Sequence, residues 1–325
     1  MRDGAECRET SDPGREVSST SAPEPGAPQL NSRMGAYVLG ARPATLPAAA
    51  VPVIVGAAVG VSTSGSFRPL VFLVTLVAAL LIQIGTNFAN DYSDFHRGVD
   101  NGGRLGPVRV TQSGLLTTLQ VKRGIIVSFG LATLAGMYLA WVGGWPIVAI
   151  GVASIVAGLA YTGGPWPFGY HALGDLFVFV FFGIVAVTGT AYLQSGDWTA
   201  RALLASLPVG FLVTNILVIN NLRDLPTDRA SGKNTLAVAI GDRATRLQYT
   251  LFSLAAFAVP VAQWLAGAEA RWILLPLLAA PAAWPLVRQV LGGTGGRDLN
   301  PLLGATGRLL ILFGVLYAAG LLLAR

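Results

Sequence analysis

The sequence predicts an all-α, multi-pass transmembrane helical bundle. Three observations support this fold class: 53% of the 325 residues are hydrophobic, only 12% are charged, and apolar stretches recur along the whole chain. Soluble domains carry about 25% charged residues, and a helix needs about 20 mostly apolar residues to cross a bilayer. Because lipid offers no hydrogen bonds to exposed backbone, these apolar stretches should form helices.

Nine stretches are apolar enough to be spans. We expect about nine helices around a central cavity, at 38–61, 69–90, 124–142, 145–162, 173–194, 202–222, 246–266, 271–290 and 302–323. Residues 1–33 are rich in Pro, Ser, Gly, Glu and Arg and show no apolar period, which indicates a disordered tail rather than a signal peptide. The transmembrane domain is therefore expected at 34–325.

Basic residues gather on one side of the predicted spans. With the N-terminus in the cytoplasm, eighteen of the 22 Lys and Arg residues fall on the cytoplasmic side, and the other four are Arg68, Arg201, Arg271 and Arg325. Cytoplasmic loops of membrane proteins carry such an excess. The bias predicts a cell-membrane protein embedded in lipid, and it explains the net charge of +6 without any nucleic-acid partner.

Cysteine and histidine chemistry is excluded by count and spacing. Cys7 is the single cysteine, so no disulfide framework and no cysteine-based metal site can form. His96 and His171 lie far apart in sequence and do not make a zinc pattern. The carboxylates are therefore the candidates for a functional site.

Two acidic clusters stand at the predicted cytoplasmic ends of spans. The first contains Asn87, Asn90, Asp91, Asp94 and Asp100, and the second contains Asn220, Asp224 and Asp228, with Lys233 following. Residues three or four apart share one face of a helix. Pro226 steers the preceding residue away from helical conformation, which leaves Asp228 either on the helix or in a loop that folds back.

The two clusters resemble each other in spacing. Each has an Asn, an Asp four residues later and another Asp three or four beyond that. Asp91 and Asp224 are 133 residues apart, a distance that covers four spans. This predicts two similar four-helix units plus one extra helix, with both clusters facing a shared cavity from the same side.

Carboxylates beside basic residues suit a magnesium–diphosphate site. Mg²⁺ prefers oxygen ligands and binds through one or two carboxylates together with substrate phosphates. Four nearby basic residues could neutralise the remaining phosphate charge: Arg104, Arg109, Arg223 and Lys233. A single charge at a span end is usually a solvated anchor, but two matched clusters indicate a site.

At these residues the chain resembles the UbiA-type intramembrane aromatic prenyltransferases, whose paired Asp-rich motifs it shares. The resemblance runs from about residue 34 to the end and rests on the stretches Ala41–Pro47, Asn90–Asp94 with Gly98 and Asp100, Arg104–Arg109 with Ser113 and Gly114, Tyr161–Pro165 with Gly174 and Asp175, and Asn220–Asp228 with Gly232–Leu236 and Gly241. Arg104–Arg109 and Tyr161–Pro165 look like the naphthoate branch of that family. Asp175 stands where that family more often has Glu.

The resemblance implies transfer of a polyprenyl group from polyprenyl diphosphate to 1,4-dihydroxy-2-naphthoate, with loss of diphosphate and carbon dioxide, giving demethylmenaquinone. It implies that Mg²⁺ is held by Asp91, Asp94, Asp224 and Asp228, aided by Asn90, Asn87 and Asp100. The diphosphate would be bound by Arg104, Arg109, Arg223, Lys233 and Asn90. Arg42, Tyr161 and Thr162 are candidates for the acceptor pocket, with membrane anchoring or helix packing as their alternative roles.

Two alternative functions stay open on the sequence. The same scaffold could act on another aromatic acceptor, such as 4-hydroxybenzoate or homogentisate. A cation-coupled membrane transporter would also use internal repeats and intramembrane acids. Transporters place these acids near the bilayer midplane, whereas the present clusters lie at one face beside basic loops.

Overall fold

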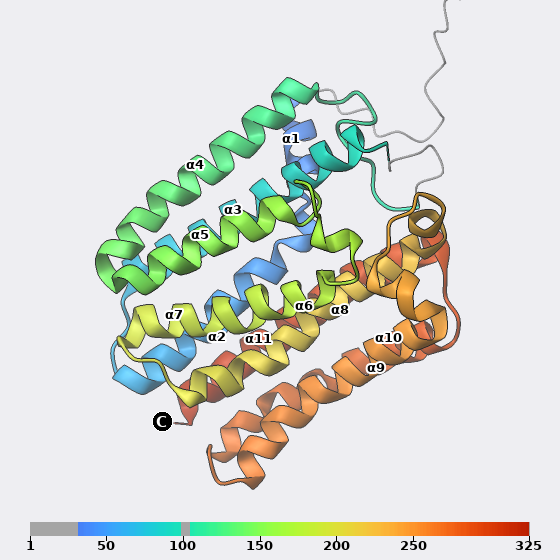
Figure 1. Ribbon diagram of the computed structural model, residues 1–325. Coiled ribbons are helices and arrows are strands. Elements are labelled where there is room, and N and C mark those ends of the chain that lie inside the picture. The colour runs from blue at the N-terminus through green and yellow to red at the C-terminus, as the bar shows by residue number, and fades with distance from the viewer. Residues whose placement is uncertain (1–31, 99–104, 325) are drawn as a thin grey trace, which may run out of the picture.

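A computed structural model describes residues 32–98 and 105–324 (Figure 1). In these two ranges the chain forms helices and no strand, with one isolated bridge between His171 and Asn234. The predicted tail up to residue 31 and the predicted site residues Asp100 and Arg104 lie outside the described residues.

Two halves of similar make-up follow each other along the chain. The first comprises α1 (Arg33–Ala41), η1 (Pro43–Thr45), α2 (Pro47–Ser64), α3 (Pro69–His96), α4 (Thr118–Gly143) and α5 (Trp145–Ala160). The second comprises η2 (Phe168–Tyr170), α6 (Gly174–Val178), the π-helical segment η3 (Phe179–Val185), α7 (Ala186–Ser195), α8 (Ala200–Ala230), α9 (Leu236–Leu265), η4 (Arg271–Ala279) and α10 (Ala280–Leu291). η5 (Gly296–Asp298) and α11 (Leu299–Leu323) complete the bundle.

Each of the nine predicted spans coincides with a helical segment. Seven segments are long and apolar enough to cross a membrane: Pro47–Ser64, Pro69–His96, Thr118–Gly143, Gly174–Ser195, Ala200–Ala230, Arg271–Leu291 and Gly296–Leu323. The remaining two predicted spans correspond to α5, which is apolar but shorter, and to the long helix α9. The predicted all-α transmembrane bundle is confirmed.

The first predicted span, 38–61, is broken rather than continuous. α1 ends at Ala41, and Arg42 adopts a left-handed conformation with φ of 53° before α2 begins at Pro47. Proline fits the first turn of a helix but not its interior, because it has no N–H to donate. Pro43 and Pro47 each start a new segment for this reason. The break places Arg42 within electrostatic reach of Asp94 on α3.

The second acidic cluster lies entirely on one helix. α8 continues through Pro226 to Ala230, so the alternative of a folded-back loop at Asp228 is wrong. Pro226 falls in the last turns of α8, where the loss of one backbone donor leaves little helix to disrupt. Membrane helices tolerate such a proline because side chains and neighbouring helices satisfy the freed backbone groups. Asn220, Asp224 and Asp228 consequently share one face.

The two halves are packed in the same way. α3 packs chiefly along α4, and α8 packs chiefly along α9, and each of these first helices ends in an acidic cluster. α2 contacts both α7 and α11 and joins the halves. Figure 1 shows α3, α4 and α5 as one group, with α2, α7, α8 and α11 beside it and α9 and α10 beyond.

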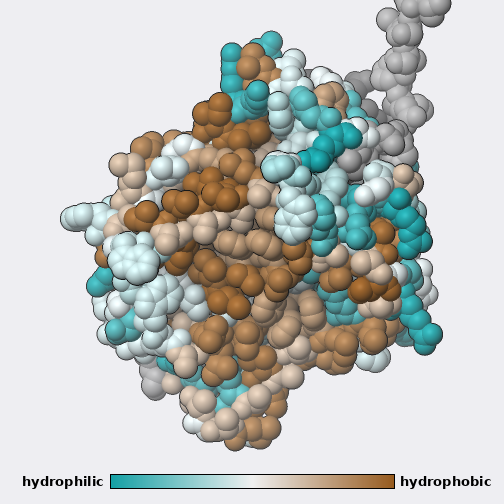
Figure 2. Space-filling view, viewed as in Figure 1, coloured by the Kyte–Doolittle hydropathy of each residue, from teal (hydrophilic) through white to brown (hydrophobic). Residues whose placement is uncertain are grey.

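The surface divides by polarity. Figure 2 shows hydrophobic residues over the middle of the molecule and hydrophilic residues gathered at the end where α8 meets the loops. Large apolar side chains such as Leu134, Val152 and Leu254 are exposed on the helix faces. Lipid is the solvent in which these exposed apolar faces are stable. The polar end contains the two acidic clusters.

Candidate functional site

Asp94 of α3 is held by two partners from different loops. Its Oδ2 accepts a hydrogen bond of 2.5 Å from Nη2 of Arg109, and its Oδ1 accepts one of 2.7 Å from the hydroxyl of Tyr170. Asp94 and Arg109 are both buried. A buried charge is stable only when it is paired and hydrogen-bonded, and this arrangement satisfies that condition.

Asp91 organises the loop that follows α3. Its two carboxylate oxygens accept the backbone N–H groups of Val110 and Thr111 at 3.1 and 3.2 Å. Asp91 and Asp94 therefore hold the same loop, because Arg109 precedes these two residues. Two predicted site residues, Asp94 and Arg109, are thus paired with each other, and Asp91 has a positioning role that the sequence did not reveal.

Arg223 organises the second cluster. Its Nε and Nη2 donate to the two oxygens of Asp224 at 2.8 and 2.6 Å. Nη2 also donates to Oδ1 of Asn220 at 2.7 Å, and Nη1 donates to Oδ1 of Asn300 at 3.0 Å. Arg223 is 1% exposed, and this network holds its guanidinium in place. Asn300, on α11, was not among the predicted site residues.

The loop held by the first cluster reaches the second. Nδ2 of Asn300 donates to the carbonyl of Leu105 at 3.0 Å. A Cβ atom added to Gly106 would lie 2.5 Å from Nη2 of Arg223, closer than real contacts allow. A side chain at Gly106 would therefore displace either the guanidinium or the loop. This contact joins residues of the two sequence halves into one site.

Tyr170 provides a second connection between the clusters. Its ring lies 5.5 Å from the guanidinium of Arg97 and 5.2 Å from Nζ of Lys233. Nζ of Lys233 is 3.9 Å from Oδ1 of Asp228. Burial and the nearby carboxylate of Asp94 raise the pKa of Tyr170, so its hydroxyl remains protonated and donates to Asp94. Sequence reasoning missed Tyr170, although its place in a loop at the polar end was a signal.

Backbone pairing holds Tyr170 and Lys233 together. The N–H of Ala172 donates to the carbonyl of Asn234 at 2.8 Å, beside the bridge between His171 and Asn234. The loop between α5 and α6 is thereby joined to the loop between α8 and α9. The geometry of Tyr170 relative to Lys233 follows from this pairing.

The predicted polar residues of α3 lie at the same end. Oδ1 of Asn90 accepts a hydrogen bond of 2.9 Å from the hydroxyl of Thr162. Nδ2 of Asn87 donates to the carbonyl of Ala41 at 2.9 Å and to Oγ1 of Thr45 at 3.2 Å. These bonds connect α3 to the end of α5 and to the break before α2.

The donor set fits Mg²⁺ bound together with a diphosphate. Within residues 32–98 and 105–324, no three His, Cys, Asp or Glu side chains are grouped to hold a metal by themselves. Mg²⁺ does not need such a group, since it binds through one or two carboxylates and takes its other oxygens from phosphates and water. The side chains of Asp224 and Asp228 are 11% and 9% exposed, against 3% for Asp94, so the second cluster is more accessible to a ligand.

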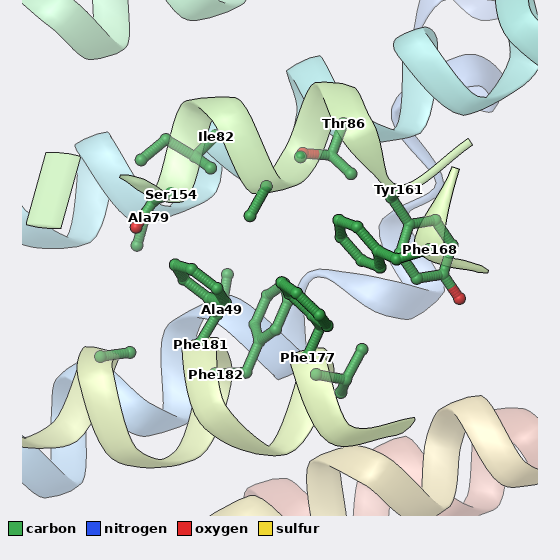
Figure 3. Close-up of a pocket in the computed structure, with 14 residues that line it drawn as sticks. Ala49, Ala79, Ile82, Thr86, Ser154, Tyr161, Phe168, Phe177, Phe181 and Phe182 are labelled. Atoms are coloured by element: carbon green, nitrogen blue, oxygen red, sulfur yellow. The ribbon is translucent and has the colours of Figure 1, made fainter. Parts of the chain in front are cut away.

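An apolar cavity begins beside the polar end. It has a volume of about 110 Å³ and is lined by Tyr161, Phe168, Phe177, Phe181 and other residues of α3, α5 and α6–η3. Figure 3 shows the phenylalanines of α6 and η3 facing Ile82, Thr86 and Ser154 across the space. Tyr161, at one end, lies within electrostatic reach of Asp94 and Asp228. A second cavity of about 290 Å³ shares lining residues such as Ile82 and Phe181, which extends the apolar space along the spans.

Comparisons with known proteins identify the family. A model of the UbiA prenyltransferase family matches residues 49–298. The 1,4-dihydroxy-2-naphthoate octaprenyltransferase of Mycobacterium tuberculosis is 40% identical over 289 residues, covering 88% of this chain and 96% of its own. The enzyme of the same name from Escherichia coli is 36% identical over 303 residues, covering 91% and 98%.

A solved structure shares the fold. The UbiA homolog from Archaeoglobus fulgidus bound to DMAPP and Mg²⁺ aligns with a TM-score of 0.63 at 16% identity, covering 89% of this chain and 99% of that one. At this identity the likeness concerns the fold alone. The family match over most of the chain, together with the two relatives, shows that the chain belongs to the UbiA prenyltransferase family.

Proposed function

We propose that this protein transfers a polyprenyl group from polyprenyl diphosphate to 1,4-dihydroxy-2-naphthoate, releasing diphosphate and carbon dioxide and forming demethylmenaquinone in its reduced, quinol form. Relatives that carry the name of this acceptor align over about nine-tenths of the chain. One structural observation carries the proposal: two acidic clusters with basic partners meet around Tyr170, beside an apolar cavity. The polar part suits a diphosphate, and the apolar part suits a prenyl chain.

The residues of the polar end would bind and activate the leaving group. Asp91, Asp94, Asp224 and Asp228, with Asn87, Asn90 and Asp100, would hold Mg²⁺, whose charge makes the diphosphate a better leaving group. Arg109, Arg223 and Lys233, with Arg104, would donate to the phosphate oxygens. Donors held in place before the reaction stabilise the charge that develops on the departing group.

The cavity would protect the reacting carbon. Departure of diphosphate leaves an allylic cation, which water would capture if it had access. The aromatic rings of Tyr161, Phe168 and Phe177 exclude water, and their faces are electron-rich enough to stabilise a cation. Arg42, Tyr161 and Thr162 would contact the acceptor at this end.

We place the polar end at the cytoplasmic face of the cell membrane. The support is the sequence bias of eighteen basic residues against four, which the positive-inside rule converts into an orientation. Both clusters lie at the C-terminal ends of α3 and α8, which this orientation puts on one side.

The test uses the purified full-length protein in lipid with a polyprenyl diphosphate, Mg²⁺ and one aromatic acid at a time. We expect prenylated naphthoquinol by mass and labelled carbon dioxide from 1,4-dihydroxy-2-naphthoate. Product from 4-hydroxybenzoate or homogentisate but not from the naphthoate would refute the acceptor and leave the reaction class standing. Absence of prenylated product from every acid would contradict the proposal and favour the transporter alternative.

A further inference from the structure

Asp175 is a buried carboxylate that the diphosphate site does not use. It is 6% exposed and lies in the first turn of α6. Its Oδ1 accepts a hydrogen bond of 2.9 Å from Nε2 of Gln248 on α9, whereas its Oδ2 is buried and accepts none from the described residues. An acid inside a membrane domain is costly to maintain, and an unpaired buried oxygen needs a reason.

The position of Asp175 relates it to the cavity. Val178, three positions later on α6, lies on the same side of the helix as Asp175 and lines the cavity. A Cβ atom added to the neighbouring Gly174 would lie 3.1 Å from the hydroxyl of Tyr161. Tyr161 lies within electrostatic reach of Asp175 as well as of Asp94 and Asp228. Asp175 therefore stands at the same end of the cavity as the diphosphate clusters.

We infer that Asp175 is the general base of the reaction and that its Oδ2 removes the proton from a ring hydroxyl of the aromatic acceptor. This inference rests on the proposed function, because it needs a hydroxylated aromatic acceptor at the cavity end. Gln248 holds Oδ1 and thereby orients Oδ2 for the proton. Gln248 donates a hydrogen bond to Asp175, and Tyr161 lies within its electrostatic reach.

The proton transfer fits the chemistry of the acceptor. The hydroxyl next to the carboxylate-bearing ring carbon gives its proton to Asp175, and its O–H electron pair moves into the ring. That ring carbon bonds to the allylic carbon, whose bond to oxygen breaks, and the diphosphate leaves with that electron pair. The product is a ketone with a carboxylate on the adjacent carbon. Its carbon–carboxylate bond breaks, carbon dioxide leaves, and the ring oxygen takes the proton back from Asp175, so no oxidant or net proton is needed.

The test compares Asp175→Asn, Asp175→Glu and the wild-type protein, with Asp197→Asn in an exposed loop as the matched control. General-base catalysis contributes about 10²–10⁴-fold, so Asp175→Asn should lose about this factor in kcat. Its KM for prenyl diphosphate and its melting temperature should stay unchanged, because Asn has nearly the same shape. Asp175→Glu keeps a carboxylate and should retain more activity than Asp175→Asn.

The pH dependence separates a base from a structural residue. A phenolic hydroxyl has a pKa of about 10. Below that pH, each increase of one pH unit raises the ionised fraction of the acceptor about tenfold. The rate of Asp175→Asn should therefore rise about tenfold per pH unit between pH 6 and 9, while the wild-type rate changes less. Two results would overturn the inference alone while the wild type still forms prenylated product: wild-type activity in Asp175→Asn, or a loss of rate with an unchanged pH profile.

The remaining outcomes also distinguish the role of Asp175 from the proposed function. If Asp175→Asn melts at a lower temperature and no longer binds prenyl diphosphate, the residue is structural and the inference is wrong. If the wild type prenylates a different hydroxylated acid, the proposed acceptor is wrong, and the same variants compared on that acid decide the role of Asp175. If the wild type prenylates no aromatic acid, both the proposed function and the inference are wrong.

Discussion

The hydroxyl of Tyr170 donates a 2.7 Å hydrogen bond to Asp94, while the ring of Tyr170 lies 5.2 Å from Nζ of Lys233, which pairs with Asp228. One side chain thus contacts residues of both acidic clusters, although the clusters come from different halves of the chain. The arrangement depends on the backbone pairing of two loops at Ala172 and Asn234. It makes Tyr170 a residue through which the proposed diphosphate site can be tested.

Replacing Tyr170 with Phe should weaken catalysis without unfolding the protein. The ring between Arg97 and Lys233 is kept, and only the hydrogen bond to Asp94 is lost. Hydrogen bonds to charged groups contribute about 1.5–3 kcal/mol, so kcat/KM for prenyl diphosphate should fall about 10- to 100-fold. Tyr138→Phe on α4 is the control and should change nothing. Wild-type kinetics in Tyr170→Phe would contradict the role of the hydroxyl.

Removing a carboxylate from either cluster should abolish most of the activity. Losing one preorganised electrostatic group commonly reduces rate by on the order of 10²–10³. We expect at least this loss for each of Asp91→Ala, Asp94→Ala, Asp224→Ala and Asp228→Ala, measured as released diphosphate. A chelator should stop the wild-type reaction, and added Mg²⁺ should restore it. Activity that survives the chelator, or wild-type rates in all four variants, would contradict the proposal that the two clusters form the active site.

Adding one methyl group at Gly106 should disturb Arg223. The new Cβ would lie 2.8 Å from Cζ of the guanidinium, which must move or displace the loop. Misplacing a substrate-binding group by about 1 Å can cost on the order of 10²-fold in rate. Gly130→Ala is the control, because its Cβ would meet open space on α4. Equal activity of the two variants would show that Arg223 does not need this contact.

An ion pair far from the site should contribute to stability and not to catalysis. Arg201 of α8 donates two hydrogen bonds to Glu269, at 2.5 and 2.7 Å, and the Glu269 side chain is 4% exposed. Breaking a buried pair costs about 3–5 kcal/mol, and the 24% exposure of Arg201 favours the lower end.

Glu269→Gln should therefore lower the melting temperature in detergent and preserve kcat at low temperature. Asp242→Asn provides the comparison, because Asp242 also pairs with an arginine but is 58% exposed. Surface pairs contribute about 0–1 kcal/mol, so Asp242→Asn should melt close to the wild type. A melting temperature in Glu269→Gln equal to that of the wild type would show that the Arg201–Glu269 pair is not stabilising.

The orientation can be measured by thiol labelling. Cys7 is the single native cysteine and can be changed to Ser without touching the described residues. In that background, Ala230→Cys at the end of α8 should react with an impermeant reagent from the cytoplasmic side. Asp197→Cys, in the loop before α8, should react from the opposite side. The reverse pattern would invert the proposed topology.

The sequence alone predicted which segments form membrane-length helices and proposed which residues would carry the chemistry. Hydropathy and length decide spans because lipid tolerates few alternatives to a helix. The 3.6-residue period then places Asp91 with Asp94, and Asp224 with Asp228, on one face each. Both inferences use residues close together in sequence, so they did not require the three-dimensional arrangement of the helices. Short sequence motifs were likewise sufficient to recognise the family resemblance.

Only the tertiary structure decided how these motifs meet. It decided that α8 passes through Pro226, that the chain breaks at Arg42, and that Asp91 is bonded to the backbone of a loop. Tyr170 and Asn300 became site residues because loops and helices distant in sequence fold onto the same end. Hydrogen bonds and ion pairs between such segments depend on side-chain distances of about 3 Å, which local sequence patterns do not specify.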